Sequence, residues 1–307
     1  MNPETEIPGA DEQVVAHHWD RNAQLWTNAI RAGQDIYREL YNQPAMLEFI
    51  GDLRGLEVLD AGCGEGYWTR ILARSGARMT GLDLSAQMIE LGRAEESRAP
   101  LGIRYAIGSY TALDGFGSET FDAVVSFMAL MDGPDLSAAL REIRRVLKPG
   151  GVLIFSILHP AFANRGTHWI LDGQARATAL QIGEYFNAEP WIDSWKFGEP
   201  ETGVKRDGWK VWRKLPERWK LWRRLPERWN LRATKSQDTD SLSIPHFSRT
   251  LSDYINTVIT SGLVLNEIAE PRPSEEACRM HPLLQRHRVH APLFLYIRTV
   301  KGDSNIH

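Results

Sequence analysis

A glycine-rich segment carries the residue types best suited to binding a ligand. It reads Asp60-Ala-Gly-Cys-Gly-Glu-Gly66, follows a short apolar run and precedes a helical pattern. Small residues at such a place let the backbone approach a ligand and leave the amides of a helix N-terminus free to donate. The spacing G-x-G-x-G differs from the dinucleotide fingerprint G-x-G-x-x-G, and the Gly-Lys-Ser/Thr of a phosphate-binding loop is missing.

Two carboxylates narrow the choice of ligand. Asp60 stands directly before the glycines, where it would repel a pyrophosphate and suits a cationic group instead. Asp83 closes the next apolar run, at the place where a carboxylate receives ribose hydroxyls in nucleotide-binding folds. An acid at the loop together with an acid on the ribose describes an adenosyl ligand that carries an ammonium group.

Apolar runs that alternate with helical patterns must position these acids. The expected strands are 56–60, 79–83, 103–108, one within 121–130, and 151–158, with helices up to about 74, at 85–95 and at 136–147. Ser85 is expected to cap the second helix. After a break, a helix from about 249 and strands at 263–270 and 292–300 complete the pattern. Buried strands with right-handed crossovers predict an α/β fold, a doubly wound, mostly parallel seven-stranded sheet of Rossmann-like type.

The pattern divides the chain into three parts. Residues 1–50 are expected to form an N-terminal helical cap, since their apolar residues recur at a spacing near 3.6, interrupted by Gly33 and Pro44. Residues 51–159 and 248–307 form the Rossmann-like core. Residues 160–247 are an insertion after the fifth strand, on the side where α/β sheets bind ligands, so a lid is predicted.

The insertion contains a tryptophan- and arginine-rich repeat over residues 209–228. Its two ten-residue copies match at eight positions, and the segment from Lys205 to Lys235 holds twelve Lys/Arg and three Asp/Glu. Three interpretations stay open: an exposed loop lengthened by duplication, a basic lid over an anionic or aromatic substrate or a dock for an acidic partner, and a nucleic-acid grip. The acidic remainder of the chain disfavours nucleic acid.

Composition excludes several classes of protein. The 307 residues are 43% hydrophobic and 24% charged, as in an ordinary globular protein, and no run is long enough to predict a membrane helix. The polar, acidic N-terminus is not expected to be a signal peptide. Two cysteines fit a reducing compartment, so a cytoplasmic location is expected. No cluster has metal-ligand spacing, so no catalytic metal is expected.

Four segments in order resemble a known family. VLDAGCGEGYWTRILA, GLDLS, FDAVVS and the LKPGG turn resemble the class I S-adenosylmethionine-dependent methyltransferases, over about 12–158 and 249–300. WDRNAQLW, SILHP and the segments near the end look like small-molecule methyltransferases of bacterial type, similar to the ubiquinone and menaquinone group. The resemblance implies S-adenosyl-L-methionine as cofactor and S-adenosyl-L-homocysteine as product.

The resemblance also assigns cofactor contacts. The glycine loop would hold the methionine end, Asp83 the ribose, and residues after the second and third strands the adenine, with Ser109 standing where the family usually has an acid. Residues after the fourth strand would line the sulfonium and substrate pocket, and the N-terminal helices would close over the cofactor. The expected cofactor-binding residues are Trp26, Asp60, Gly62, Cys63, Gly64, Asp83, Leu84, Met88, Gly108, Ser109, Tyr110, Phe127 and Met128.

Methyl transfer is an in-line displacement, so the protein mainly aligns the acceptor and excludes water. A general base is needed only if the acceptor must lose a proton. The candidates are His159 at the end of the fifth strand, Tyr185 in the insertion and His246 before the next helix. For His159 the alternative is a loop cap that binds a backbone carbonyl.

Other functions stay open at this stage. An enzyme of the same fold could use the cofactor without methyl transfer, by cyclisation or aminocarboxypropyl transfer, and release methylthioadenosine. An RNA methyltransferase is less expected, because Ser126-Phe-Met-Ala129 stands where a base-flipping Asn-Pro-Pro-Tyr motif would lie. A non-catalytic binding module is the last alternative. The expected partner is a small-molecule substrate, with no membrane, and the chain could be a monomer or a homodimer.

Overall fold

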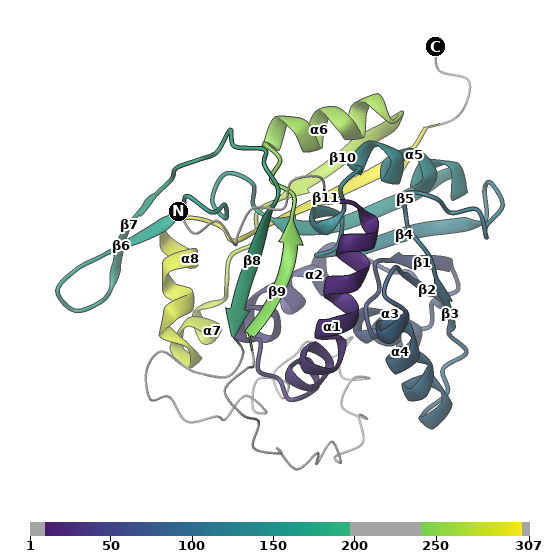
Figure 1. Cartoon of the computed structure of the whole chain (residues 1–307), viewed down its shortest axis with the longest axis horizontal. Coiled ribbons are helices and arrows are strands. Elements are labelled where there is room, and N and C mark those ends of the chain that lie inside the picture. The colour runs from purple at the N-terminus through teal and green to yellow at the C-terminus, as the bar shows by residue number, and fades with distance from the viewer. Residues whose placement is uncertain (1–9, 197–240, 303–307) are drawn as a thin grey trace.

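A seven-stranded sheet forms the centre of the molecule (Figure 1), in a computed structural model that describes residues 10–196 and 241–302. The strand order is β10-β11-β5-β4-β1-β2-β3. Strands β1 to β5 are parallel, and β11 is antiparallel to both of its neighbours. The strands are β1 (Glu57–Ala61), β2 (Arg78–Asp83), β3 (Arg104–Ile107), β4 (Phe121–Phe127), β5 (Leu147–Leu158), β10 (Leu263–Ala269) and β11 (Phe294–Lys301). The predicted doubly wound, mostly parallel α/β fold is confirmed.

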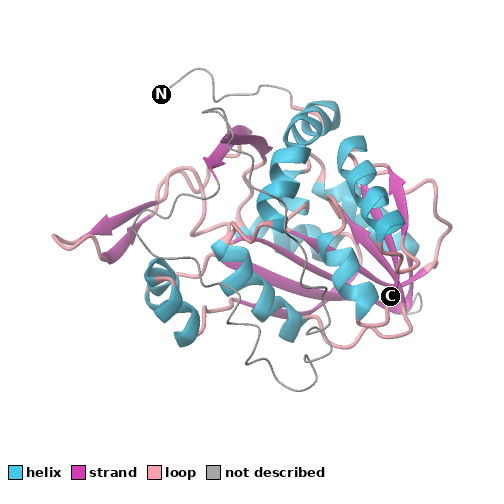
Figure 2. Cartoon of the chain, turned by 90° about the horizontal axis from the view of Figure 1, so that it is seen from below, coloured by secondary structure: helices cyan, strands magenta, loops and turns pink. Residues whose placement is uncertain are grey.

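Helices cover both faces of this sheet (Figure 2). They are α1 (Glu12–Arg31), α2 (Gln43–Phe49), α3 (Tyr67–Arg74), α4 (Ala86–Arg98), α5 (Leu136–Val146), α6 (Leu251–Thr260), α7 (Glu275–Met280) and α8 (Gln285–Val289). As predicted, Ser85 caps α4, where its side chain accepts from the Met88 amide. Within the described ranges, no helix is both long and apolar enough to cross a membrane.

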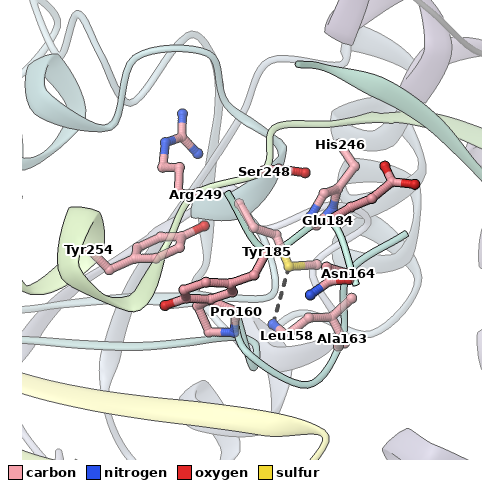
Figure 3. A pocket seen from close by; sticks show the side chains of 11 residues that line it. Leu158, Pro160, Ala163, Asn164, Glu184, Tyr185, His246, Ser248, Arg249 and Tyr254 are labelled. Carbon is pink, nitrogen blue, oxygen red and sulfur yellow. Dashed lines mark hydrogen bonds between the residues drawn. The ribbon is translucent and has the colours of Figure 1, made fainter. Parts of the chain in front are cut away.

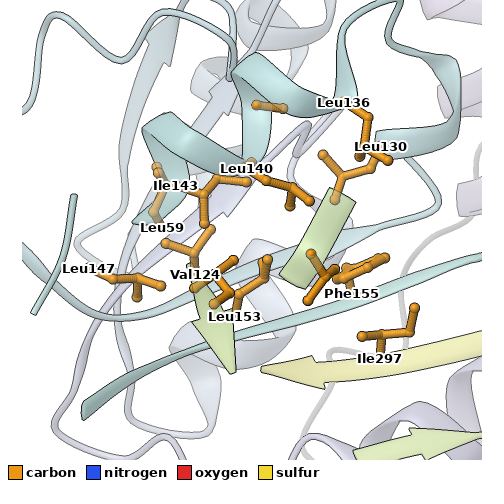
Figure 4. Packing of buried hydrophobic residues seen from close by; sticks show 14 of the residues in the cluster. Leu59, Val124, Leu130, Leu136, Leu140, Ile143, Leu147, Leu153, Phe155 and Ile297 are labelled. Carbon is orange, nitrogen blue, oxygen red and sulfur yellow. The ribbon is translucent and has the colours of Figure 1, made fainter. Parts of the chain in front are cut away.

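Successive side chains of a strand point to opposite faces of the sheet. The inner strands carry apolar side chains on both faces, which helices cover. Leu153 and Phe155 of β5 pack with α5 and α6, as Figure 4 shows for α5, whereas Ile154 packs on the opposite face with α2, α3 and α7. β5 begins at Leu147, four residues before the predicted strand. Its register against β4 shifts there, from the pair Phe121–Leu147 to Ala123–Val152.

The N-terminal region forms two helical stretches. Asp11 caps α1 through the amides of Gln13 and Val14. The second stretch passes through a π-helical turn, η2 (Arg38–Asn42), into α2. Pro44 was expected to interrupt the pattern, but it lies at the start of α2, where its missing N–H is tolerated.

The insertion contributes two pairs of strands that the sequence analysis did not place. The hairpin β6 (His168–Leu171) and β7 (Ala177–Gln181) projects from the left of Figure 1, and β8 (Trp191–Lys196) and β9 (Ser241–His246) lie beside α1. The repeat at 209–228 lies outside the described residues. The three-part division of the chain, including the lid, stays a prediction.

Candidate functional site

The carboxyl ends of the parallel strands bring the candidate acids to one edge of the sheet. Asp60 lies in β1 and Asp83 ends the neighbouring strand β2. In open α/β sheets, ligands bind outside this edge, near the strand at which the chain order reverses. That strand is β1, which lies between β4 and β2.

The glycine loop between β1 and α3 requires its glycines. Gly62, Gly64 and Gly66 all have positive φ, a region that side chains disfavour. A Cβ on Gly62 would lie 2.4 Å from the Cβ of Ala129, whereas a Cβ on Gly64 would meet nothing within 4 Å. Gly62 is therefore packed against the turn after β4, while the α-carbon of Gly64 faces open space beside the two acids.

Burial controls the charge of these acids. Asp60 is 1% exposed and accepts a hydrogen bond of 2.6 Å from Thr69 Oγ1. Desolvation raises its pKa to about 7, and the negative charge of Asp83 adds to the effect. Desolvation likewise raises the pKa of Asp83 to about 6, although the amides of Ser85 and Gly64 donate to its two oxygens.

The charge of Asp20 adds to the raised pKa of Asp83, and acids with raised pKa values favour a nearby cation and oppose an anion. The loop thus offers an open backbone face beside buried negative charge, without a basic side chain on the carboxylates of Asp60 or Asp83 among the described contacts. This environment fits the ammonium and sulfonium groups of S-adenosylmethionine. It does not suit a pyrophosphate. Cys63 is buried in the same loop, where desolvation and the surrounding acids raise the pKa of its thiol.

An acid that the sequence analysis missed lies beside Ser109, after β3. The Ser109 hydroxyl donates to Glu12 Oε1 at 2.6 Å, and the Thr111 hydroxyl donates to the same oxygen at 2.5 Å. The predicted contact of Ser109 with adenine stays a prediction. Glu12 stands in the first turn of α1, so the N-terminal helix brings a carboxylate to the end of β3. Only the long-range contact reveals it.

The remaining cofactor candidates surround this edge at different depths. Leu84 is half-buried, Met88 is fully buried, and the amide of Gly108 donates to the carbonyl of Asp83. The Tyr110 hydroxyl donates to the carbonyl of Ala129, 3.2 Å away.

Aromatic side chains flank the same edge. Phe127 lies against the Trp68 ring at 4.6 Å, and Met128, which follows it, has a φ of 57°. Trp26 packs edge-on to Trp19 on α1, with ring centroids 5.3 Å apart.

α1 is fastened over the site by polar contacts. Arg31 pairs with Glu65 of the glycine loop at 2.9 Å. Ser85 at the start of α4 donates to Asp20 at 2.6 Å. On the other side, the carbonyl of Ser243 in β9 accepts hydrogen bonds from His18 and Asn22. One helix therefore contacts the glycine loop, the second acid's loop and the insertion.

A small cavity brings two of the three catalytic candidates together (Figure 3). His246 and Tyr185 both line it, beside the end of β5. Its volume is about 20 Å³, room for one or two water molecules. Burial and the charge of Arg249 lower the pKa of His246 to about 4, so its imidazole is neutral at pH 7. The Tyr185 hydroxyl accepts from the Leu251 amide at 2.9 Å, which fixes its ring.

His159 does not line this cavity itself, although its neighbours Leu158 and Pro160 do. It is 2% exposed; its Nδ1 accepts from the Ala161 amide at 3.2 Å, and its Nε2 lies 2.9 Å from Glu270 Oε1. An accepting Nδ1 leaves the proton on Nε2, which then donates to Glu270. Both nitrogens are thus used inside the protein, as in a loop cap. Within the described ranges, no group of three His, Cys, Asp or Glu is placed to hold a metal ion.

Comparison with known proteins assigns the class. Residues 59–155 match the family model described as a methyltransferase domain. Over 119 residues the chain is 34% identical to the ubiquinone biosynthesis O-methyltransferase of Xanthomonas oryzae pv. oryzae (strain PXO99A), which spans 38% of this chain and 50% of that protein. Over 116 residues it is 40% identical to the demethylmenaquinone methyltransferase of Lactococcus lactis subsp. lactis (strain IL1403), 36% of this chain and 46% of that protein.

Comparison of the folds also finds a methyltransferase, and the similarity extends over more of the chain. The crystal structure of an S-adenosylmethionine dependent methyltransferase from Mesorhizobium loti superposes with a TM-score of 0.60, at 23% identity, over 84% of this chain and 96% of that one. Residues 59–155 therefore match a methyltransferase domain, and the sheet has the fold of a solved S-adenosylmethionine dependent methyltransferase. It spans about half the length of the curated relatives it matches.

Proposed function

We propose that this protein transfers a methyl group from S-adenosylmethionine to a small-molecule acceptor by in-line displacement. The observation that carries the proposal is the buried Asp60 and the partly buried Asp83, both with raised pKa values, beside the open face of Gly64. S-adenosylmethionine supplies a methyl group already activated by its sulfonium. The protein's own part is to hold the cofactor, align the acceptor and exclude water.

Each cofactor contact has a residue to make it. The loop amides and Asp60 would hold the methionine end, and Asp83 would receive the ribose hydroxyls. Ser109, with Glu12 behind it, would face the adenine. α1 would close the site, because its contacts span the glycine loop and the start of α4.

The acceptor side is proposed to be the cavity of Figure 3. His246 is the candidate to take a proton from an acceptor hydroxyl, and Tyr185 forms a wall. The lowered pKa of His246 opposes this proton transfer until the acceptor changes its surroundings. The names of the two curated relatives point to quinone biosynthesis, so an O-methylated quinone precursor is the finer form of the proposal. Two free, buried cysteines support a cytoplasmic location as part of it.

Mass spectrometry of the cofactor's fate tests the proposal. The pure protein is incubated with S-adenosylmethionine, with and without a small-molecule extract of the host cell. We expect S-adenosylhomocysteine only with extract, and a product heavier by one CH₂. Methylthioadenosine above a no-enzyme control would show instead that a different carbon–sulfur bond is cut. An Asp83→Ala variant that still bound the cofactor normally would overturn the site assignment.

A further inference from the structure

One oxygen of a buried carboxyl group, next in sequence to a residue that lines the cavity, has no hydrogen-bond partner among the described residues. Asp132 ends the 3-10 turn η3 (Leu130–Asp132) after β4 and is 4% exposed. Its Oδ1 is fully buried and receives no hydrogen bond from the described residues. Desolvation raises the pKa of this carboxyl well above its usual value, the charges of Asp193 and Asp83 raise it further, and that of Arg249 lowers it. Buried polar groups without a partner are rare, and each needs an explanation.

A guanidinium group nearby is half satisfied in the same way. Arg249 Nη2 donates to the carbonyls of Gly133 and Pro134 at 2.6 and 3.0 Å, which fixes the plane of the group. Its Nη1 is buried without an acceptor in the part of the chain that the structure describes. Arg249 influences Asp132 electrostatically, yet among the described ion pairs the two are not joined. A buried acceptor and a buried donor are therefore both left open.

Both groups belong to the acceptor side of the site. Arg249 lines the cavity, and so does Met131, the residue before Asp132. The Phe247 amide donates to the carbonyl of Met131, which fastens the end of β9 to η3. The charges of Asp83 and of Arg249, which lines the cavity, both influence the Asp132 carboxyl.

We propose that Asp132 and Arg249 bind the acceptor at two points. An O–H or N–H group of the acceptor donates to Asp132 Oδ1, and a neighbouring oxygen accepts from Arg249 Nη1. The acceptor is therefore a molecule with a hydroxyl or amine group beside an oxygen. This inference rests on the proposed function. The cavity holds only one or two water molecules as it stands, so its lining side chains must move when the acceptor binds.

If Asp132 is kept unsatisfied for a ligand, its replacement should not destabilise the free protein. Asp132→Leu removes a buried group that no protein donor satisfies, so we expect the thermal midpoint of the free protein to stay equal or rise by a few degrees. An acid with a purely structural role would lower it. Asp132→Asn keeps an acceptor oxygen and should lose less function than Asp132→Leu. Asp114→Asn, on an exposed loop, is the matched control.

The functional measurement uses a dilution series of the host-cell extract as the acceptor source. For Asp132→Leu we expect the extract concentration at half-maximal formation of S-adenosylhomocysteine to rise at least tenfold. The dissociation constant of S-adenosylmethionine, measured by calorimetry, should stay within about twofold. A lower thermal midpoint with unchanged half-saturation would overturn the inference, as would an acceptor without any hydroxyl or amine group. If the unchanged protein neither bound the cofactor nor formed S-adenosylhomocysteine, the proposed function itself would fail.

Discussion

The proposed cofactor side and the proposed acceptor side of the sheet edge are built from different parts of the chain. The cofactor side comes from one continuous segment, β1, the glycine loop and α3, with Asp83 on the adjacent strand. The acceptor side is assembled from η3, the end of β5, Tyr185 and the residues after β9. A fixed backbone can bind a cofactor that many enzymes share. Separate loops can change which acceptor is bound without disturbing the cofactor site.

The largest expected effect concerns the two acids of the cofactor side. Folding raises the pKa of Asp60 from 3.8 to about 7 and that of Asp83 from 3.8 to about 6. Their contribution to stability is therefore fully present below pH 3.8 and is lost as the pH rises through 6 and 7. Each ionisation costs the free protein on the order of 3 kcal/mol. Urea unfolding between pH 4 and 8 measures this.

Asp60→Asn and Asp83→Asn should each flatten that pH profile, and S-adenosylmethionine should restore stability most above pH 7. If both variants kept the pH profile of the unchanged protein, the ionisation of Asp60 and Asp83 would not be the cause of the loss of stability. Asp114→Asn, which is exposed, should leave the profile as it is.

The next prediction compares two glycines of the same loop. Gly62→Ala forces a Cβ onto Ala129 and a side chain into positive φ, so we expect a loss of about 2–5 kcal/mol in the free energy of unfolding. Gly64→Ala meets open space and should lose only about 1–2 kcal/mol from its φ. Gly64→Ala should nevertheless weaken cofactor binding, because its new methyl group occupies the open face. Thermal unfolding and calorimetry separate the two effects.

Two histidines sharpen the comparison on the acceptor side. His246→Gln removes the neutral imidazole from the cavity and should lower kcat about 10–100-fold, with the cofactor dissociation constant unchanged. His159→Gln should instead lower the thermal midpoint, because both nitrogens of His159 bind within the protein. If His159→Gln lowered kcat and His246→Gln lowered only the thermal midpoint, the proton acceptor would be His159, at the end of β5.

The smallest effect is expected for the acid that α1 supplies. Glu12→Gln weakens the contacts to Ser109 and Thr111, so the cofactor dissociation constant should rise about 3–10-fold, since a charge-assisted hydrogen bond is lost. Glu48→Gln changes an exposed acid on α2 and serves as the control. An unchanged dissociation constant for Glu12→Gln would show that Glu12 of α1 does not contribute to cofactor binding.

The inner strands β1, β4 and β5 were predictable because they contain runs of buried apolar residues. Leu153, Ile154 and Phe155 are all fully buried, a pattern that marks an internal parallel strand. The strands of the insertion gave no such signal. Ile170 and Leu171 of β6 remain 48% and 53% exposed, so neither alternation nor a buried run distinguishes them from a loop.

The candidate site likewise contains residues that could be predicted from the sequence and residues that could not. Asp60, Asp83 and the glycines could be proposed from spacing, because the loop connects neighbouring strands. Glu12 and Asp132 could not, since their roles depend on contacts with Ser109, 97 residues from Glu12, and on a partner missing at Asp132. Long-range pairing and unsatisfied polarity leave no local pattern in a sequence.

The contacts of α1 also bear on the sequence of binding events. This helix bonds to the glycine loop through Arg31 and to β9 through His18 and Asn22. A helix tied to both sides cannot swing away from one without loosening the other. In the proposed arrangement, entry of the cofactor beneath α1 disturbs β9 and, with it, the wall of the acceptor cavity, so we expect compulsory-order kinetics, with the cofactor binding first and leaving last.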